Sequence, residues 1–158
     1  MSEDIYHKLG KHLSALGMGY PDKEELIDIL KANFTALEAE ISLGIPTGVI
    51  PFEPVSVDLI ADKLKMSPEK IAPVLDNLAQ RGLLFSRKLA DGTAGYALHQ
   101  FGHGFPQTFF WGGIDAPQAK SAAEMLVRYS KLPDIEKAYG ETSSKAFRFV
   151  PIISSPDP

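Results

Sequence analysis

Apolar residues recur at helical spacing near the start of the chain and predict two helices there. The first stripe runs through residues 5–16 at intervals of three or four, and glycines follow it, as is typical of a helix end. The second stripe lies within residues 20–34 and surrounds more than half of the helix circumference, which indicates burial on several sides. We therefore expect residues 1–34 to form N-terminal helices that pack on the core.

Residues 35–98 carry the pattern around which the chain is organised, and it opens with a third helix. Thr35 stands three residues before Glu38, which is the spacing of a capping box, so a helix is expected over residues 36–43. Residues 44–54 are rich in proline and glycine and indicate a loop that leads to a short strand.

Two short helices with a tight connection are predicted next, at residues 57–64 and 68–81. Ser56 and Ser67 precede them as expected N-caps, because a hydroxyl group accepts a hydrogen bond from the free amides of a first turn. A proline opens the second helix, where its missing N–H costs nothing, and Gly82 follows its end, where glycine adopts a left-handed conformation without strain.

A hairpin completes this pattern. Residues 83–85 and 96–98 are expected to be strands, and the segment between them, which contains Asp91, Gly92 and Gly95, is expected to be a turn. Two helices followed by such a hairpin indicate a winged helix-turn-helix. We therefore predict a mainly α protein, a winged helix-turn-helix with a small antiparallel β wing and flanking N- and C-terminal helices.

Residues 99–152 are expected to complete the same domain. Their aromatic segment, residues 101–111, holds four phenylalanines and the only tryptophan, which favours core packing, with a pocket for a planar ligand as the alternative. Helical patterns follow at residues 117–132 and 134–139. Residues 153–158 are rich in serine and proline and are expected to be a tail or linker.

Composition narrows the functional classes. With 158 residues and 44% hydrophobic content the chain can bury a real core. Its net charge of -4 gives no global attraction to nucleic acid or to an anionic membrane, so any such binding needs a local positive patch. Because cysteine is absent, disulfides, thiolate catalysis and an iron–sulfur cluster held by this chain's own thiolates are excluded.

Neither a membrane span nor a catalytic motif is recognisable. No apolar run approaches the roughly 18 residues that a bilayer requires, and the first residues lack the features of a signal peptide, so we expect a cytoplasmic protein without a membrane partner. His99 and His103 are four residues apart, but glycines on either side of His103 argue against a helix that presents both rings. We expect no enzymatic activity, no metal site and no cofactor in this chain.

The charges of the predicted winged unit decide how well it suits DNA. The second helix of such a motif usually enters the major groove with its N-terminal half. Here its exposed side carries two carboxylates and one lysine, and residues 56–98 hold six positive against five negative side chains. The residues expected to contact a polar protein partner or DNA are Ser67, Lys70, Asn77, Arg87 and Lys88.

Four segments carry a family resemblance: DKEELIDILKANFTALEAEISLGI, VSVDLIADKLKMSPEKIAPVLDNLAQRGLLF, the aromatic run behind the hairpin, and FRFVPI near the end. In this order they resemble bacterial and archaeal ferredoxin-type proteins that carry a winged helix N-terminal to a 4Fe-4S domain. The resemblance implies a non-catalytic regulatory or docking module whose partner is a protein or a downstream iron–sulfur domain. Because this chain has no cysteine, no cluster-ligating residue carries over.

The helix-turn-helix part also looks like that of multiple-antibiotic-resistance and arsenic-type repressors. That likeness implies the alternative function, a homodimeric transcriptional regulator that binds double-stranded DNA. The two hypotheses separate on salt, because phosphate binding must weaken steeply as ionic strength rises, whereas docking through apolar helices need not.

Overall fold

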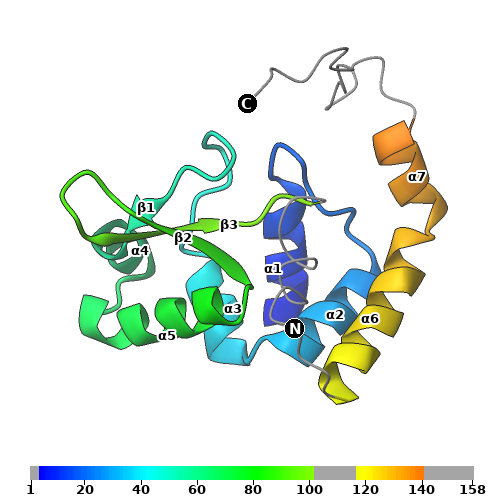
Figure 1. Ribbon diagram of the computed structural model, residues 1–158, viewed down its shortest axis with the longest axis horizontal. Helices are drawn as coiled ribbons and strands as arrows, with labels where there is room; N and C mark the ends of the chain where they lie inside the picture. Colours follow the sequence, from blue (N-terminus) through cyan, green and yellow to red (C-terminus); the bar gives the residue numbers. More distant parts are fainter. Residues whose placement is uncertain (1–3, 102–116, 141–158) are drawn as a thin grey trace, which may run out of the picture.

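The computed structural model describes residues 4–101 and 117–140, which form seven helices and one three-stranded antiparallel sheet (Figure 1). The first two helices are α1 (Ile5–Ser14) and α2 (Glu24–Asn33). Both bury an apolar face, as predicted. Helix α1 ends before the end of its apolar stripe, and the last residue of that stripe, Leu16, is buried in the turn that follows.

The middle of the chain forms α3 (Ala36–Ser42), β1 (Val55–Ser56), α4 (Val57–Leu64), α5 (Pro68–Gln80), β2 (Leu84–Lys88) and β3 (Ala94–Leu98). A long loop, residues 43–54, separates α3 from β1, and the later connections are short. The predicted capping box of α3 is confirmed. The Thr35 hydroxyl oxygen accepts a hydrogen bond from the Glu38 amide at 3.3 Å, and the Glu38 carboxylate accepts one from the Thr35 amide at 2.7 Å.

The two serine caps differ. Ser56 caps α4, since its hydroxyl oxygen accepts a hydrogen bond from the amide of Leu59 at 3.3 Å. Ser67 precedes α5, but its side chain makes no capping bond, so that part of the prediction is wrong. The amide of Lys70 donates instead to the backbone carbonyl of Ser67 at 3.1 Å, and Pro68 fixes the backbone at the start of the helix.

Helices α4 and α5 both end in a left-handed residue. Gly82 has φ 73° and is followed by a bond from the Leu83 amide to the Leu78 carbonyl at 2.9 Å, which matches the predicted helix end. Lys65 takes the same role after α4, with φ 54°. A lysine tolerates this conformation less well than glycine. It nevertheless gives the tight turn between the two helices.

The sheet has the strand order β1-β3-β2, and its hairpin is longer than predicted. Gly95, which the sequence placed in the turn, lies in β3 opposite Arg87. A Cβ atom at this position would come within 2.6 Å of the Leu89 side chain, so glycine is required by close packing and not by a turn. The turn spans residues 89–93, where Gly92 has φ 84° and forms the bulge of a three-residue loop.

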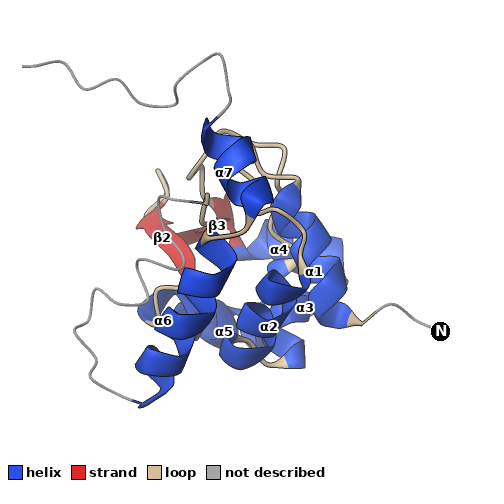
Figure 2. Cartoon of the chain, turned by 90° about the vertical axis from the view of Figure 1, so that its right-hand side faces the viewer, coloured by secondary structure: helices blue, strands red, loops and turns tan. Residues whose placement is uncertain are grey.

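Helix α6 (Pro117–Ser130) packs along α2, and α7 (Pro133–Gly140) follows it (Figure 2). The Tyr129 hydroxyl donates to the Pro21 carbonyl at 2.7 Å, and Lys23 forms an ion pair with Asp134. Within the described ranges no helix combines the length and apolar character needed to cross a bilayer. Most of the predicted aromatic segment and the predicted tail lie outside the described residues.

The end of β3 is joined to the loop between α1 and α2. The Gln100 side-chain oxygen accepts a hydrogen bond from the Met18 amide, and the Phe101 amide donates to the Met18 carbonyl, both at 2.9 Å. The Phe101 ring lies edge-to-face between Tyr20 and Tyr129, at centroid distances of 5.3 and 5.8 Å. The hairpin is therefore anchored at its base to the N-terminal helices and to α6.

Candidate partner-binding surface

Four of the five predicted contact residues lie in two exposed groups. Ser67 and Lys70 are exposed at the start of α5. Arg87 and Lys88 are exposed at the end of β2, next to the hairpin turn. In Figure 1 this hairpin extends away from α6 and α7. All four side chains are available to a partner, because none of them takes part in an ion pair or hydrogen bond within the described part of the chain.

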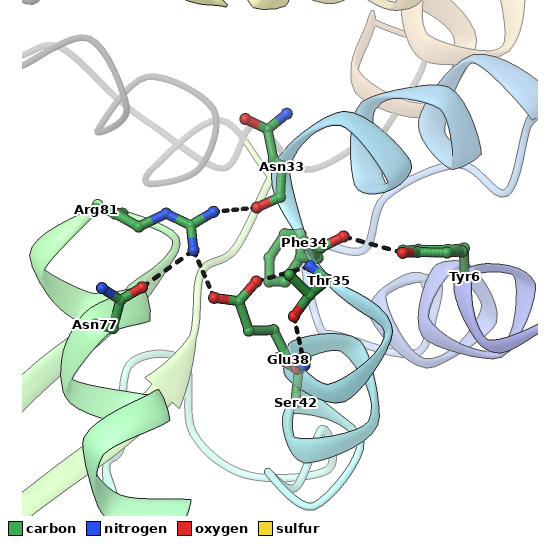
Figure 3. Close-up of polar contacts among 8 residues, drawn as sticks. All are labelled: Tyr6, Asn33, Phe34, Thr35, Glu38, Ser42, Asn77 and Arg81. Atoms are coloured by element: carbon green, nitrogen blue, oxygen red, sulfur yellow. Dashed lines mark hydrogen bonds and ion pairs between the residues drawn. The ribbon is translucent and has the colours of Figure 1, made fainter.

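The fifth predicted residue, Asn77, belongs to a polar network between helices (Figure 3). Its side-chain oxygen accepts a hydrogen bond from Arg81 at 3.1 Å. The same guanidinium donates to the Glu38 carboxylate at 2.6 Å and to the backbone carbonyl of Asn33. Since the Glu38 carboxylate also caps α3 at Thr35, this network fixes the end of α5 to the junction of α2 and α3. Asn77 is exposed, yet its carbonyl oxygen already has an internal donor.

This network changes the charge count of the predicted winged unit. Arg81 was one of the six positive side chains counted over residues 56–98, and its charge is matched by Glu38, which is only 8% exposed and lies outside that segment. The remaining ionised side chains of residues 56–98 are all exposed, and they are five cations and five carboxylates. Their charges cancel. The five cations are Lys63, Lys65, Lys70, Arg87 and Lys88, and the five carboxylates are Asp58, Asp62, Glu69, Asp76 and Asp91.

One of these carboxylates is tied to the sheet. The Tyr96 hydroxyl on β3 donates a hydrogen bond to Asp76 on α5. Burial of the phenol, followed by this bond to a carboxylate, raises the pKa of Tyr96, so the hydroxyl stays a donor at neutral pH. The contact fixes the middle of α5 to β3.

A second buried polar residue, His99, lies at the base of the hairpin. It is 6% exposed, and neither ring nitrogen makes a hydrogen bond of normal geometry within the described residues. Burial lowers its pKa from 6.5 to about 4, although the nearby Leu84 backbone opposes this shift. The ring borders a cavity of about 10 Å³, which is roughly the space of one water molecule. This cavity is too small for an organic ligand.

Within the described ranges, no group of three histidine, aspartate or glutamate side chains is placed to hold a metal ion. His103, which the sequence analysis considered beside His99, lies outside these ranges. Comparisons of the chain with protein-family models, with curated proteins and with solved structures gave no match.

The sequence did not reveal two properties of the surface. One is the inward direction of Arg81, for which the only available signal was the capping box of Thr35 and Glu38, the latter 43 residues earlier. The other is the open outer edge of β2, which requires the strand order β1-β3-β2 to be known.

Proposed function

We propose that residues 35–98 form a winged helix-turn-helix that docks on a protein partner and has no catalytic role. The order of α3, β1, α4, α5 and the β2–β3 hairpin supports this assignment, as does the strand order β1-β3-β2. The tight turn at Lys65 and the capped start of α4 agree with it as well. The function follows from the surface that this unit presents and not from its fold, since one fold supports many functions.

The cancelled charge of residues 56–98 is the observation that carries the proposal. DNA-binding surfaces concentrate lysine and arginine, because each neutralised phosphate contributes to affinity. Here the exposed cations and carboxylates are equal in number, and Glu69 stands beside Lys70 in the first turn of α5. Mixed charges of both signs suit the polar rim of a protein interface. The resemblance described above adds a class of partner, a 4Fe-4S redox domain or protein.

The exposed start of α5 and the exposed hairpin tip favour the alternative function, a homodimeric DNA-binding regulator. These two parts of a winged helix usually meet the major groove and the phosphate backbone. In this alternative, Ser67 and Lys70 contact bases or phosphates, and Arg87 and Lys88 contact the backbone.

Fluorescence anisotropy against a pool of genomic duplex fragments separates the two functions. We expect the folded chain to show no sequence-selective binding at low or moderate salt, and in-cell cross-linking from residues near Lys70 and Arg87 to yield protein partners. Selective, salt-sensitive DNA binding by a dimer overturns the docking proposal. The variant Lys70→Glu is the control, because it replaces a cation at the start of α5 by a carboxylate and should weaken any real DNA complex and reduce its salt dependence.

A further inference from the structure

The hydrogen bonds of the hairpin turn determine which groups of β2 face outward. The Leu89 amide donates to the Thr93 carbonyl at 2.8 Å, so this pair is a hydrogen-bonded one. Hydrogen-bonded and non-hydrogen-bonded pairs alternate along an antiparallel ladder. With the observed register, Arg87 therefore bonds to β3, whereas the amide and carbonyl groups of Ser86 and Lys88 point away from it.

These outward groups form an open strand edge. Strand β2 is the last strand on its side of the sheet. Within residues 4–101 and 117–140, no backbone or side-chain group forms a hydrogen bond with the amides or carbonyls of Ser86 and Lys88. Both residues are exposed, and no proline interrupts the strand. An edge of this kind is a template for an additional strand.

The side chains along the edge determine what kind of strand it accepts. Neighbouring residues of a strand point to opposite faces, so Arg87 and Lys88 place one positive charge on each face of the sheet. Charged side chains on an edge oppose pairing with an apolar or cationic strand. A second copy of this chain would double the positive charge along the edge. A strand with two consecutive carboxylates would neutralise both cations, one on each face.

We propose that the outer edge of β2 binds an extended acidic segment of a protein partner by β-strand addition, with carboxylates opposite Arg87 and Lys88. This inference rests on the proposed docking function and names the chemistry of the partner. The backbone of Ser86 and Lys88 supplies the hydrogen bonds, and the two cations select for negative charge. Strand β2 also packs against α5, so it is held to the rest of the molecule on a side other than the proposed binding edge.

The test uses the full chain and a capped peptide, Thr-Val-Glu-Glu-Val-Thr, with the Lys-Lys version of the same peptide as its control. Amide hydrogen exchange is measured by NMR with and without peptide. We expect the acidic peptide to slow exchange at Ser86 and Lys88 and to leave Arg87 unchanged, because the Arg87 amide is already bonded within the sheet. The Lys-Lys peptide should have no effect.

Two variants separate the backbone contribution from the charge contribution. Ser86→Pro removes only an outward amide, which an edge strand tolerates, and should weaken peptide binding about tenfold. Arg87→Glu/Lys88→Glu should weaken it by at least about the same factor, through the lost and reversed cross-strand pairs. Lys63→Glu/Lys65→Glu makes the same charge change on exposed residues at the end of α4 and should leave binding within about twofold.

Equal losses in the two charge variants, or exchange protection away from Ser86 and Lys88, overturn the proposal. If Ser86→Pro does not fold, amide exchange in the unmodified chain, with and without the acidic peptide, tests the backbone contribution on its own. Absence of peptide binding together with protein cross-links near Lys70 refutes the strand addition but leaves the docking function intact. Selective DNA binding overturns the proposed docking function itself, whether or not the peptide binds.

Discussion

Glu38, near the start of the proposed winged helix, and His99, directly after its last strand, are both buried polar residues, but only the Glu38 side chain has hydrogen-bond partners in the described part of the chain. One oxygen of Glu38 accepts a hydrogen bond from the Thr35 amide, and the other accepts one from Arg81. The ring nitrogens of His99 have no such partners within the described residues. A buried charge is stable only where it is paired, so the Arg81 guanidinium compensates Glu38, whereas burial keeps the His99 ring neutral.

This difference in hydrogen bonding distinguishes a buried polar residue that stabilises the fold, Glu38, from one whose side chain is buried without stabilising polar contacts in the described ranges, His99. The Glu38 contacts connect three helices and orient α5. The His99 ring occupies space between Phe52 and the small cavity, at a centroid distance of 6.2 Å from the Phe52 ring. Removing a partner should therefore destabilise the first site, and adding a proton should destabilise the second.

The largest expected effect is the pH dependence that His99 gives to stability. Its folded pKa of about 4 lies below the ordinary value of 6.5, so the unfolded chain binds the proton more readily between these values. Stability is then complete above pH 6.5 and falls as the pH decreases toward 4, by about 3 kcal/mol in total and about 2 kcal/mol of it above pH 5. Urea unfolding at several pH values between 5 and 7.5 measures this slope.

The variant His99→Phe provides the control for this prediction, because it keeps a ring but cannot take up a proton. Its unfolding free energy should change much less over the same pH range. His12 also has a pKa lowered by burial and leaves a smaller slope of the same sign in both proteins. If the variant retains the full slope of the unmodified chain, the assignment to His99 is wrong.

Breaking the Glu38 site should have the next largest effect. Arg81→Ala leaves the carboxylate of Glu38 without its cationic partner and frees the carbonyl of Asn33, at a cost of about 2 kcal/mol in unfolding free energy. Part of the guanidinium is exposed, which limits the loss. The matched variant Lys70→Ala on the same helix should change stability by less than about 0.5 kcal/mol. Comparable losses of unfolding free energy in both variants would contradict the claim that the inward-pointing Arg81 stabilises the fold more than the exposed Lys70.

Local signals in the sequence were sufficient for most of the described helices and for the hairpin. The Thr35 and Glu38 spacing, the Ser56 cap and Gly82 each act within one turn of a helix, so they could be recognised without a structure. The role of Gly95 could not be recognised in this way, because glycine is needed there to avoid a collision with the Leu89 side chain and not to form a turn. The winged-helix interpretation goes beyond this level of detail and stays a prediction.

The candidate surface was less predictable, because it depends on contacts between residues that are distant in the sequence. Lys70, Arg87 and Lys88 are exposed, but the partner of Arg81 lies 43 residues away, and nothing local shows in which direction that side chain turns. The same holds for Tyr96 and Asp76, and for the open edge of β2. A charge count from sequence alone therefore overstated the unpaired positive charge of residues 56–98.

Loss of the bond between Tyr96 and Asp76 should have a smaller effect than loss of Arg81, since Asp76 is exposed and water replaces the hydroxyl. Tyr96→Phe should lower the unfolding free energy by about 1 kcal/mol. Asp76→Asn, which retains an acceptor, should cost less. Thermal denaturation of the two variants in parallel measures the difference. A larger loss in Asp76→Asn would mean that the charge of Asp76, and not the hydrogen bond, holds α5 against the hairpin.

The smallest expected effect contrasts the two serines that precede α4 and α5. Ser56 accepts the Leu59 amide, so Ser56→Ala should cost about 0.5 to 1 kcal/mol, as the loss of a helix cap does. Ser67→Ala should cost less than about 0.3 kcal/mol, because its hydroxyl caps nothing and the Lys70 amide already bonds to the Ser67 carbonyl. Chemical denaturation of both variants resolves this difference. Equal losses would show that Ser67 caps α5 in solution, and the start of α5 would then be as firmly fixed as its end, which Arg81 holds.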